Sequence, residues 1–335
     1  MHIAIIGAGI AGLTAARYCQ QQGHTVTVYE KNADVAGRMA TRQTELGGFD
    51  LGAQYFTGRS SRFQKEIKDW LNLSWIAPWG NRLVALDHGQ VQVVKDQVER
   101  YVPVLGMSSL CKQLAHGVDV RLEQKVTSLH REGDVWHVSI ECDSVAIAAT
   151  AGPFDAVLLA IPPEMARPLV SKAILNNVNF KAQLDTMNSL PCWSLSLGFY
   201  DSLNLPYEGA WVANSRLSWI ACDTSKPQHR AGERWVCHAS SEWSAEHLED
   251  DALRVQDKLL KAFHEATGSP VHPIYVEVFR WRYAQAQQTN LDSCWWDESA
   301  KLGLCGDWFS CGLEKQARVE NAFLSGLELA QKIVK

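Results

Sequence analysis

The glycine-rich turn at residues 7–12 constrains the fold of this chain more than any other feature of the sequence. The turn reads Gly-Ala-Gly-Ile-Ala-Gly, and it joins a short apolar run at residues 2–6 to a helix-prone stretch at residues 13–22. A second apolar run follows at residues 25–29 and ends in Glu30. This order of a strand, a glycine turn, a helix, a second strand and an acidic residue predicts a unit that binds a dinucleotide.

Each part of such a unit has a mechanical role. Gly7 permits the tight turn, Gly9 lets a pyrophosphate approach the backbone, and Gly12 lets the helix pack closely on the sheet. The positive end of the helix then faces the phosphates. At the tip of the second strand, Glu30 can accept hydrogen bonds from ribose hydroxyls and repels a 2′-phosphate, so we expect FAD or NAD and not NADP.

The composition is that of an ordinary soluble globular protein and excludes several functions. The 335 residues, 46% of them hydrophobic, are enough for about two domains. A formal charge of −5 without a Lys/Arg cluster argues against nucleic-acid binding. No apolar run could span a bilayer and the first strand begins at once, so we expect a cytoplasmic protein with no membrane segment. The nine cysteines lack metal-ligand spacing, so we expect reduced thiols and no metal site.

The order of apolar patterns predicts an α/β chain with two interleaved domains. Helices are expected at 61–72 and 106–114, and a small antiparallel meander between residues 79 and 104. Several alternating strands precede one long helix at 245–267, whose apolar residues recur at helical spacing. A Rossmann-type nucleotide domain is therefore interrupted by an α+β domain built on a mostly antiparallel sheet. The expected bounds are 1–60, 105–162 and 285–335 for the nucleotide domain, and 61–104 and 163–284 for the substrate domain.

A second informative site is Gly306-Asp307. It follows the apolar residues 301–305 and precedes a closing helix expected at 317–334. Because the chain would return here to the N-terminal sheet, the Asp307 carboxylate can bind a polyol hydroxyl of the same ligand. The N-terminus of the closing helix carries about half a positive charge and suits the flavin edge where negative charge gathers on reduction. This closure favours a flavin over NAD.

Further motifs run through the chain in a fixed order. They are Glu30-Lys31, Gly37-Arg38-Met39, Asp50-Leu-Gly-Ala-Gln-Tyr-Phe56, Gly106-Met-Ser-Ser109, Phe279-Arg-Trp-Arg-Tyr283, Leu304-Cys-Gly-Asp-Trp308 and Val319-Glu-Asn-Ala-Phe-Leu-Ser-Gly326. With the glycine turn, they make the chain resemble the flavin-containing amine oxidase superfamily and, within it, the renalase family. The fold implied by this resemblance is the FAD-binding variant of the Rossmann fold that glutathione reductase and amine oxidases share.

The resemblance also implies that FAD is bound without a covalent link. The residues that would contact it are Gly7, Gly9, Ile10, Ala11, Gly12, Glu30, Lys31, Gly37, Arg38, Met39, Ala53, Gln54, Val126, Gly306, Asp307 and Val319. Val126 would act through its backbone, near the adenine. The Arg38 guanidinium can fork onto pyrophosphate oxygens, which is a stronger arrangement than lysine provides.

The activity that the resemblance implies is oxidation of the 2- or 6-dihydro isomers of NAD(P). A hydride would pass to flavin N5 and the electrons to molecular oxygen, giving NAD(P)⁺ and hydrogen peroxide. A dihydropyridine that loses hydride becomes an aromatic cation, so the enzyme needs stacking and charge stabilisation and no general base. Accordingly, the sequence shows no nucleophile–base motif, and we expect no catalytic side chain.

The substrate pocket is expected to contain Tyr55, His238, Trp281 and Tyr283. The favoured alternative for His238 is a hydrogen-bonded core histidine, and Trp281 and Tyr283, two apart on one strand, fit a pocket wall and plain core equally well. Most of the thirteen tryptophans are core or interface residues on this view, and a few would stack on a flat substrate. Two other functions stay open: a flavin amine oxidase, which must manage an amine pKa near ~10, and an FAD-binding redox sensor without turnover.

Overall fold

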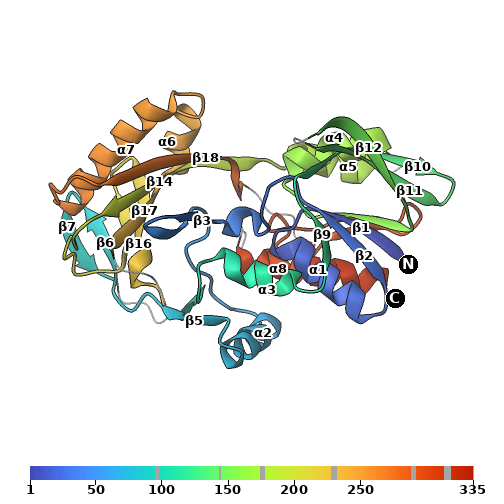
Figure 1. Cartoon of the computed structure of the whole chain (residues 1–335), viewed down its shortest axis with the longest axis horizontal. Coiled ribbons are helices and arrows are strands. Elements are labelled where there is room, and N and C mark those ends of the chain that lie inside the picture. Colours follow the sequence, from blue (N-terminus) through green and yellow to red (C-terminus); the bar gives the residue numbers. More distant parts are fainter. Residues whose placement is uncertain are drawn as a thin grey trace.

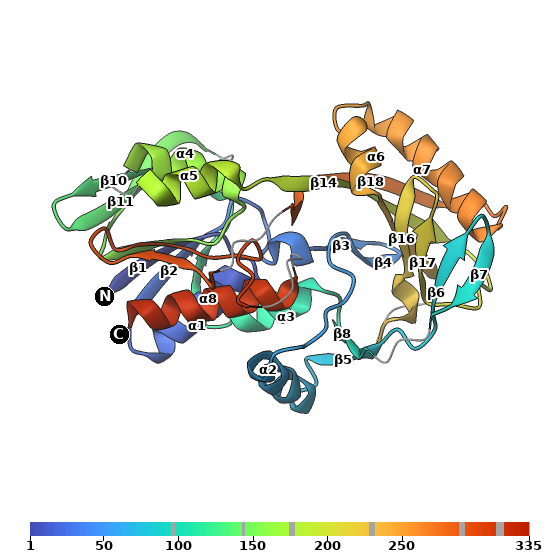
Figure 2. The same ribbon diagram turned by 180° about the vertical axis from the view of Figure 1, so that it is seen from behind.

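A computed structural model gives the fold of the chain, and it describes residues 1–94, 98–142, 145–173, 178–227, 232–287, 292–312 and 318–334. Two large sheets dominate the fold and lie at opposite ends of the molecule (Figure 1). Both ends of the chain lie beside the first of these sheets, as Figure 2 also shows from behind. The α/β fold class expected from the sequence is thereby confirmed.

The first sheet is the mainly parallel sheet that the glycine turn predicts. Its six strands are, in order, β19 (Trp295–Asp297), β20 (Leu302–Leu304), β13 (Ala156–Leu159), β1 (His2–Ile6), β2 (Thr25–Tyr29) and β9 (Asp119–Arg121). The strand β19 is antiparallel to β20, and the other neighbours pair in parallel. The sheet therefore unites strands from the beginning, the middle and the end of the chain.

Alternate residues of this sheet point into two different cores. Ile3 and Ile5 pack with one set of helices, whereas Ala4 and Ile6 pack on the opposite face. The first face is covered by α1 (Ile10–Gln21), α3 (Ser108–Ala115) and α8 (Val319–Ile333). The second is covered by α4 (Pro163–Ala173), α5 (Val178–Thr186) and an antiparallel sheet of β10 (Gln124–Glu132), β11 (Val135–Cys142) and β12 (Val145–Phe154). Two apolar faces explain why these strands read as continuous apolar runs.

The second sheet has seven strands and is mostly antiparallel. Its order is β18 (Tyr275–Ala286), β14 (Ser189–Phe199), β17 (Glu233–Ala239), β16 (Leu217–Cys222), β15 (Gly209–Ala213), β6 (Leu83–Asp87) and β7 (Gln90–Val93). The helices α6 (Ser241–Glu246) and α7 (Ala252–Thr267) cover one face. The long strands β14 and β18 extend from this sheet toward the first one (Figure 2). On the face opposite these helices, Phe49 and Leu51 pack against Val236.

The single helix expected at 245–267 is wrong, because the chain breaks between α6 and α7. Asp251 is the N-cap of α7, and its carboxylate accepts hydrogen bonds from the backbone N–H groups of Leu253 and Arg254 at 3.0 and 3.3 Å. Such a side-chain cap starts a helix and competes with an unbroken one. The apolar stripe predicted for this region does bury Val255, Leu259 and Phe263.

The single meander expected between residues 79 and 104 is also wrong. The strands β6 and β7 do form a hairpin, but β6 pairs in parallel with β15 of the second sheet. A separate ribbon joins β5 (Ile76–Trp79) to β8 (Arg100–Pro103) beside α2 (Ser61–Asn72), the helix expected there. A further ribbon, β3 (Thr41–Thr44) with β4 (Gly47–Asp50), lies between the two large sheets.

The domain bounds given above remain a prediction. In the structure β6 and β7 join the second sheet, whereas α4 packs against β10. Within the described residues, no helix combines the length and the apolar character that crossing a membrane requires. The described cysteine side chains are free thiols, and no group of three or more His, Cys, Asp or Glu residues in the described part of the chain could hold a metal.

Candidate active site

A cavity of about 1420 Å³ extends from the carboxyl ends of β1 and β2 to the face of the second sheet opposite α6 and α7. Among its lining residues are Tyr55, His238, Trp281 and Tyr283, the four expected in the substrate pocket. It is also lined by every residue expected to contact FAD except Gly12. Segments from both ends of the chain thus contribute to one hollow, where the chemistry of a bound dinucleotide would take place.

The three glycines of the turn differ in what surrounds them. A Cβ added at Gly7, where φ is +104°, would lie 2.6 Å from the carbonyl oxygen of Ala160, and one at Gly12 would lie 2.0 Å from that of Gly7. Packing of the protein therefore requires both glycines. A Cβ at Gly9 would meet no protein atom within 4 Å, although Gly9 lines the cavity. The space beside Gly9 fits a ligand that approaches the backbone.

The N-terminus of α1 points its free backbone groups at the same place. Gly9 is the N-cap, no side chain caps the helix, and the first turn contains no acidic residue. The N–H groups of the first turn lack partners within a helix. Since Ile10 and Ala11 line the cavity, these groups and the helix dipole form a site for the pyrophosphate.

Glu30 is held rigidly at the tip of β2. The side chain is 5% exposed, and its carboxylate accepts hydrogen bonds from the backbone N–H of Ala8 at 2.9 Å and from the backbone and side chain of Asn32 at 2.9 and 2.6 Å. The carboxylate is therefore fixed against the glycine turn. Because it lines the cavity, it is placed to accept bonds from ribose hydroxyls.

Arg38 and Asp307 join the two ends of the chain at the cavity. The guanidinium donates to both carboxylate oxygens, at 2.8 and 2.7 Å. The two carboxylate oxygens fit the planar pair of donors that the guanidinium offers, and the expected contact of Arg38 with pyrophosphate oxygens remains a prediction. This ion pair holds the turn at Gly37 close to the turn at Gly306. Both turns can therefore contact the same ligand.

The second sheet supplies an aromatic wall. Phe279, Ser194, His238, Trp219 and Trp211 lie opposite one another in consecutive strands β18, β14, β17, β16 and β15. Directly opposite residues point to the same face of a sheet, and all but Ser194 line the cavity. Sequence reasoning missed Phe279, Trp211 and Trp219, because strand register decides which of many tryptophans share a face.

His238 has a defined protonation state. Its Nε2 bonds the carbonyl oxygen of Leu51 at 3.0 Å, so this nitrogen carries the hydrogen. Burial, with a smaller contribution from the positive charge of Lys226, lowers the pKa of His238 to about 4. The imidazole is consequently neutral at physiological pH. Trp281 Nε1 donates to the same carbonyl at 3.1 Å, so Leu51 aligns two predicted pocket residues.

Tyr55 stands at the other end of the wall. Its ring lies 5.9 Å from that of Trp79 and 5.7 Å from that of Trp219, and the Arg100 guanidinium lies 5.4 Å from the Tyr55 ring centroid. The aromatic rings there form a contiguous cluster of tilted rings, which supports the view that some tryptophans shape the pocket. Tyr283 is 36% exposed and lies at the rim.

Solved structures with the same fold include two oxidases. A putative protoporphyrinogen oxidase from Exiguobacterium sp. 255-15 superposes with a TM-score of 0.75 over 99% of this chain and 98% of its own, at 13% identity. Cyclohexylamine oxidase from Brevibacterium oxydans IH-35A superposes with a TM-score of 0.73 over 99% and 98% of the two chains, also at 13% identity. At this identity the similarity describes the fold alone.

Sequence relatives match only a short part of the chain. An L-amino-acid oxidase from Siganus canaliculatus is 46% identical over 65 residues, which are 19% of this chain and 12% of that protein. A 4,4'-diapophytoene desaturase from Staphylococcus aureus (strain Newman) is 50% identical over 52 residues, or 16% and 10% of the two proteins. The chain thus matches about an eighth of the length of these relatives or less.

Two family models together cover almost the whole chain. Residues 5–72 match the NAD(P)-binding Rossmann-like domain, and residues 70–334 match the flavin containing amine oxidoreductase family. The open space at Gly9, the uncapped N-terminus of α1 and the fixed carboxylate of Glu30 fit the dinucleotide half of FAD. FAD is the cofactor that these residues and both family models indicate, and the chain belongs to the flavin containing amine oxidoreductase family.

Proposed function

We propose that the protein oxidises a dihydronicotinamide, the 2- or 6-dihydro isomer of NAD(P), to NAD(P)⁺ and reduces oxygen to hydrogen peroxide. The observation that carries this proposal is the aromatic, uncharged row of Phe279, His238, Trp219 and Trp211 that faces the cofactor motifs. When bound, FAD supplies an acceptor for the hydride at its N5 atom. The residues of the chain then need to bind, orient and shield the substrate ring.

The aromatic wall suits the charge that develops in this reaction. A dihydronicotinamide becomes a cation as it loses hydride, and the faces of aromatic rings attract cations. His238 remains neutral because its pKa is lowered to about 4, so no positive imidazole opposes the developing charge. The Leu51 carbonyl holds His238 and Trp281 in place before the substrate arrives, which lowers the cost of reorganisation.

Different residues of the cavity would bind different parts of FAD. The N-terminus of α1 and the space at Gly9 accept the pyrophosphate, and Glu30 accepts the adenosine ribose. Arg38 and Asp307 hold the remaining polyol and phosphate groups from the two ends of the chain. Val126 also lines the cavity, and the adenine would lie against its backbone.

A flavin amine oxidase is the second candidate, and the fold similarity to cyclohexylamine oxidase favours it. An alkylammonium with a pKa near ~10 must lose a proton before oxidation. His238, with a pKa of about 4, is too weak a base for that step. We therefore rank the amine second.

The experiment that separates these functions is anaerobic mixing of the oxidised holoprotein with three kinds of reductant. These are 6-dihydro-NAD, ordinary NADH and a panel of primary and secondary amines, and the loss of flavin absorbance is followed in time. We expect rapid bleaching by 6-dihydro-NAD and stoichiometric formation of NAD⁺. Rapid bleaching by an amine without bleaching by the isomer would establish the amine oxidase, and bleaching by none would favour a redox sensor.

A further inference from the structure

We propose that Lys226 is the positioning residue of the active-site wall. It fixes residues 50–54, called segment 50–54, from the side that faces away from the cavity. This segment aligns the cofactor motifs with the aromatic face. This inference rests on the proposed function and names a residue that acts through others. Lys226 is not among the residues that line the cavity, and neither are Asp50 and Asp223.

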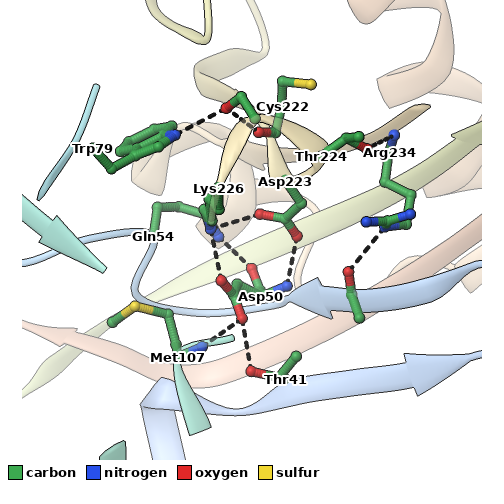
Figure 3. A network of polar contacts seen from close by, with 12 residues as sticks. Thr41, Asp50, Gln54, Trp79, Met107, Cys222, Asp223, Thr224, Lys226 and Arg234 are labelled. Atoms are coloured by element: carbon green, nitrogen blue, oxygen red, sulfur yellow. Dashed lines mark hydrogen bonds and ion pairs between the residues drawn. The ribbon is translucent and has the colours of Figure 1, made fainter. Parts of the chain in front are cut away.

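The core of the arrangement is a buried ammonium between two carboxylates (Figure 3). Lys226 Nζ lies 2.7 Å from Asp50 Oδ2 and 2.6 Å from Asp223 Oδ1, and the three side chains are at most 1% exposed. Asp50 ends β4, whereas Asp223 begins the 3-10 turn Asp223–Ser225 that follows β16. The three residues thus connect the central ribbon to the second sheet.

Lys226 and Asp223 hold both ends of segment 50–54. The backbone N–H of Asp50 donates to Asp223 Oδ2 at 2.7 Å. At the other end, Lys226 Nζ donates to Gln54 Oε1 at 3.4 Å, and Gln54 Nε2 donates back to the carbonyls of Asp50 and Gly52. The orientation of the Gln54 amide is therefore set by the ammonium on one side and by main-chain carbonyls on the other.

The second oxygen of Asp50 is also occupied. Asp50 Oδ1 accepts hydrogen bonds from Thr41 Oγ1 at 2.6 Å and from the backbone N–H of Met107 at 2.8 Å. This carboxylate consequently joins three elements, namely β3, the start of α3 and the turn that carries Lys226 (Figure 3). A shift of Lys226 would change the position of Asp50 and so of the segment that it begins.

The opposite side of the segment faces the active site. The Leu51 carbonyl accepts from both His238 and Trp281, and the backbone N–H of Ala53 donates to the Arg38 carbonyl at 2.9 Å. A Cβ added at Gly52 would lie 2.1 Å from that same carbonyl. The segment therefore fits tightly between the sheet wall and the cofactor turn, and a small displacement would reach both.

The charges in this region balance. Arg234, which is 1% exposed, donates to the carbonyls of Leu46 and Gly48 at 2.7 and 3.2 Å, and the charges of Asp223 and Asp50 act on it. Two buried cations thus face two buried anions. Such groups often stabilise a fold no better than well-packed apolar residues would, and fixing one geometry is their best-attested use. This favours a positioning role over a purely stabilising one.

The test compares four variants of the FAD-bound protein. Lys226→Met removes the ammonium, Lys226→Arg keeps a positive charge, and Asp223→Asn keeps the shape of the side chain. Leu259→Ala is the matched control, because Leu259 is buried in α7 against the far face of the second sheet and its truncation leaves a cavity that lowers stability. For each, we would measure Tm, FAD affinity, the flavin circular dichroism spectrum and the rate of anaerobic reduction at saturating substrate.

We expect Lys226→Met to retain FAD, to alter its circular dichroism and to slow reduction by about tenfold to a hundredfold, since small misplacements have effects of this size. Lys226→Arg should recover part of the reduction rate that Lys226→Met loses. The reduction rate of Asp223→Asn should lie between those of Lys226→Met and the unaltered protein. Leu259→Ala should lower Tm without changing the rate. If Lys226→Met does not fold, Asp223→Asn provides the same comparison.

Two results would overturn the proposal: an unchanged rate and spectrum in Lys226→Met and Asp223→Asn, or equal rate losses in these variants and Leu259→Ala at equal losses of Tm. If 6-dihydro-NAD fails to reduce the unaltered protein, the proposed function fails instead. The comparison then uses the reductant that does bleach the flavin, and the circular dichroism spectrum reports on positioning in either case.

Discussion

At the scale of single residues, glycines with similar places in the turn have different reasons to be glycine. Gly12 is required by the approach of α1 to the Gly7 carbonyl, whereas Gly9 has open space where its side chain would be. Gly9 also has extended backbone, with φ of −76°, which any residue adopts. Its identity is therefore explained by the ligand and not by the fold.

This difference predicts that Gly9→Ala separates folding from cofactor binding. The apoprotein should keep its stability within about 0.5 kcal/mol, as for a substitution that contacts nothing, while FAD affinity falls because the methyl group occupies the path of the pyrophosphate. Thermal unfolding of the apoprotein and FAD titration measure the two effects. Gly12→Ala is the contrast and should fail in both. Unchanged FAD affinity in Gly9→Ala would show that the pyrophosphate lies elsewhere.

Glu30 gives a second prediction at this scale. Loss of a charged hydrogen-bond acceptor costs ~1.5–3 kcal/mol, so Glu30→Ala should weaken FAD binding by roughly ten- to a hundredfold. Glu30→Gln, which still accepts hydrogen bonds, should lose less. Equilibrium dialysis with FAD measures the affinity of each variant. Full occupancy of Glu30→Ala by FAD would mean that the ribose does not contact this carboxylate.

At the scale of elements, the first and last helices approach each other closely. A Cβ added at Gly326 of α8 would lie 2.1 Å from the Ala11 carbonyl of α1. In an isolated helix, replacing glycine by alanine gains ~1 kcal/mol. Gly326→Ala should instead destabilise the protein, since α8 must move away from α1. Chemical denaturation measures the sign, with exposed Lys332→Ala as control, and a gain in stability would refute the close packing.

Titration of the buried Asp223 carboxyl should make the stability of the folded protein depend on pH. Burial raises the pKa of Asp223 to about 6, against an ordinary value of 3.8, with Asp50 adding to the effect and Lys226 opposing it. The folded state therefore binds this proton more tightly than the unfolded state. Its contribution to stability is full below pH ~4 and is lost as pH rises through 6. Asp223→Asn should flatten the dependence of Tm on pH in this window. An unchanged slope would place the titration elsewhere.

At the scale of the whole molecule, local patterns predicted more than long-range ones. The nucleotide unit, the closing helix and the fold class follow from patterns within about thirty residues, and the structure places the predicted site residues around one cavity. The break before α7 and the parallel pairing of β6 with β15 were missed. The break depends on a capping aspartate, Asp251, inside a helical pattern. The pairing of β6 with β15 depends on strands that are far apart in sequence.

The network around Lys226 shows the same limit most clearly. Lys226 is 176 residues from Asp50 and 172 from Gln54 along the chain, and nothing in the local sequence distinguishes it from an exposed lysine. The aromatic wall depends likewise on strand register. Sequence patterns can therefore indicate which chemistry is present, whereas the alignment of its parts depends on tertiary packing.

The central claim is that both ends of the chain hold one FAD, with its isoalloxazine ring against segment 51–54 and facing the aromatic wall. A crystal structure of the FAD-bound protein tests it most directly. The account predicts electron density for the pyrophosphate at the N-terminus of α1, the adenosine ribose at Glu30 and the tricyclic ring between Ala53 and the His238 row. Density that places the ring outside this cavity, or the polyol and phosphate groups away from Arg38 and Asp307, would contradict it.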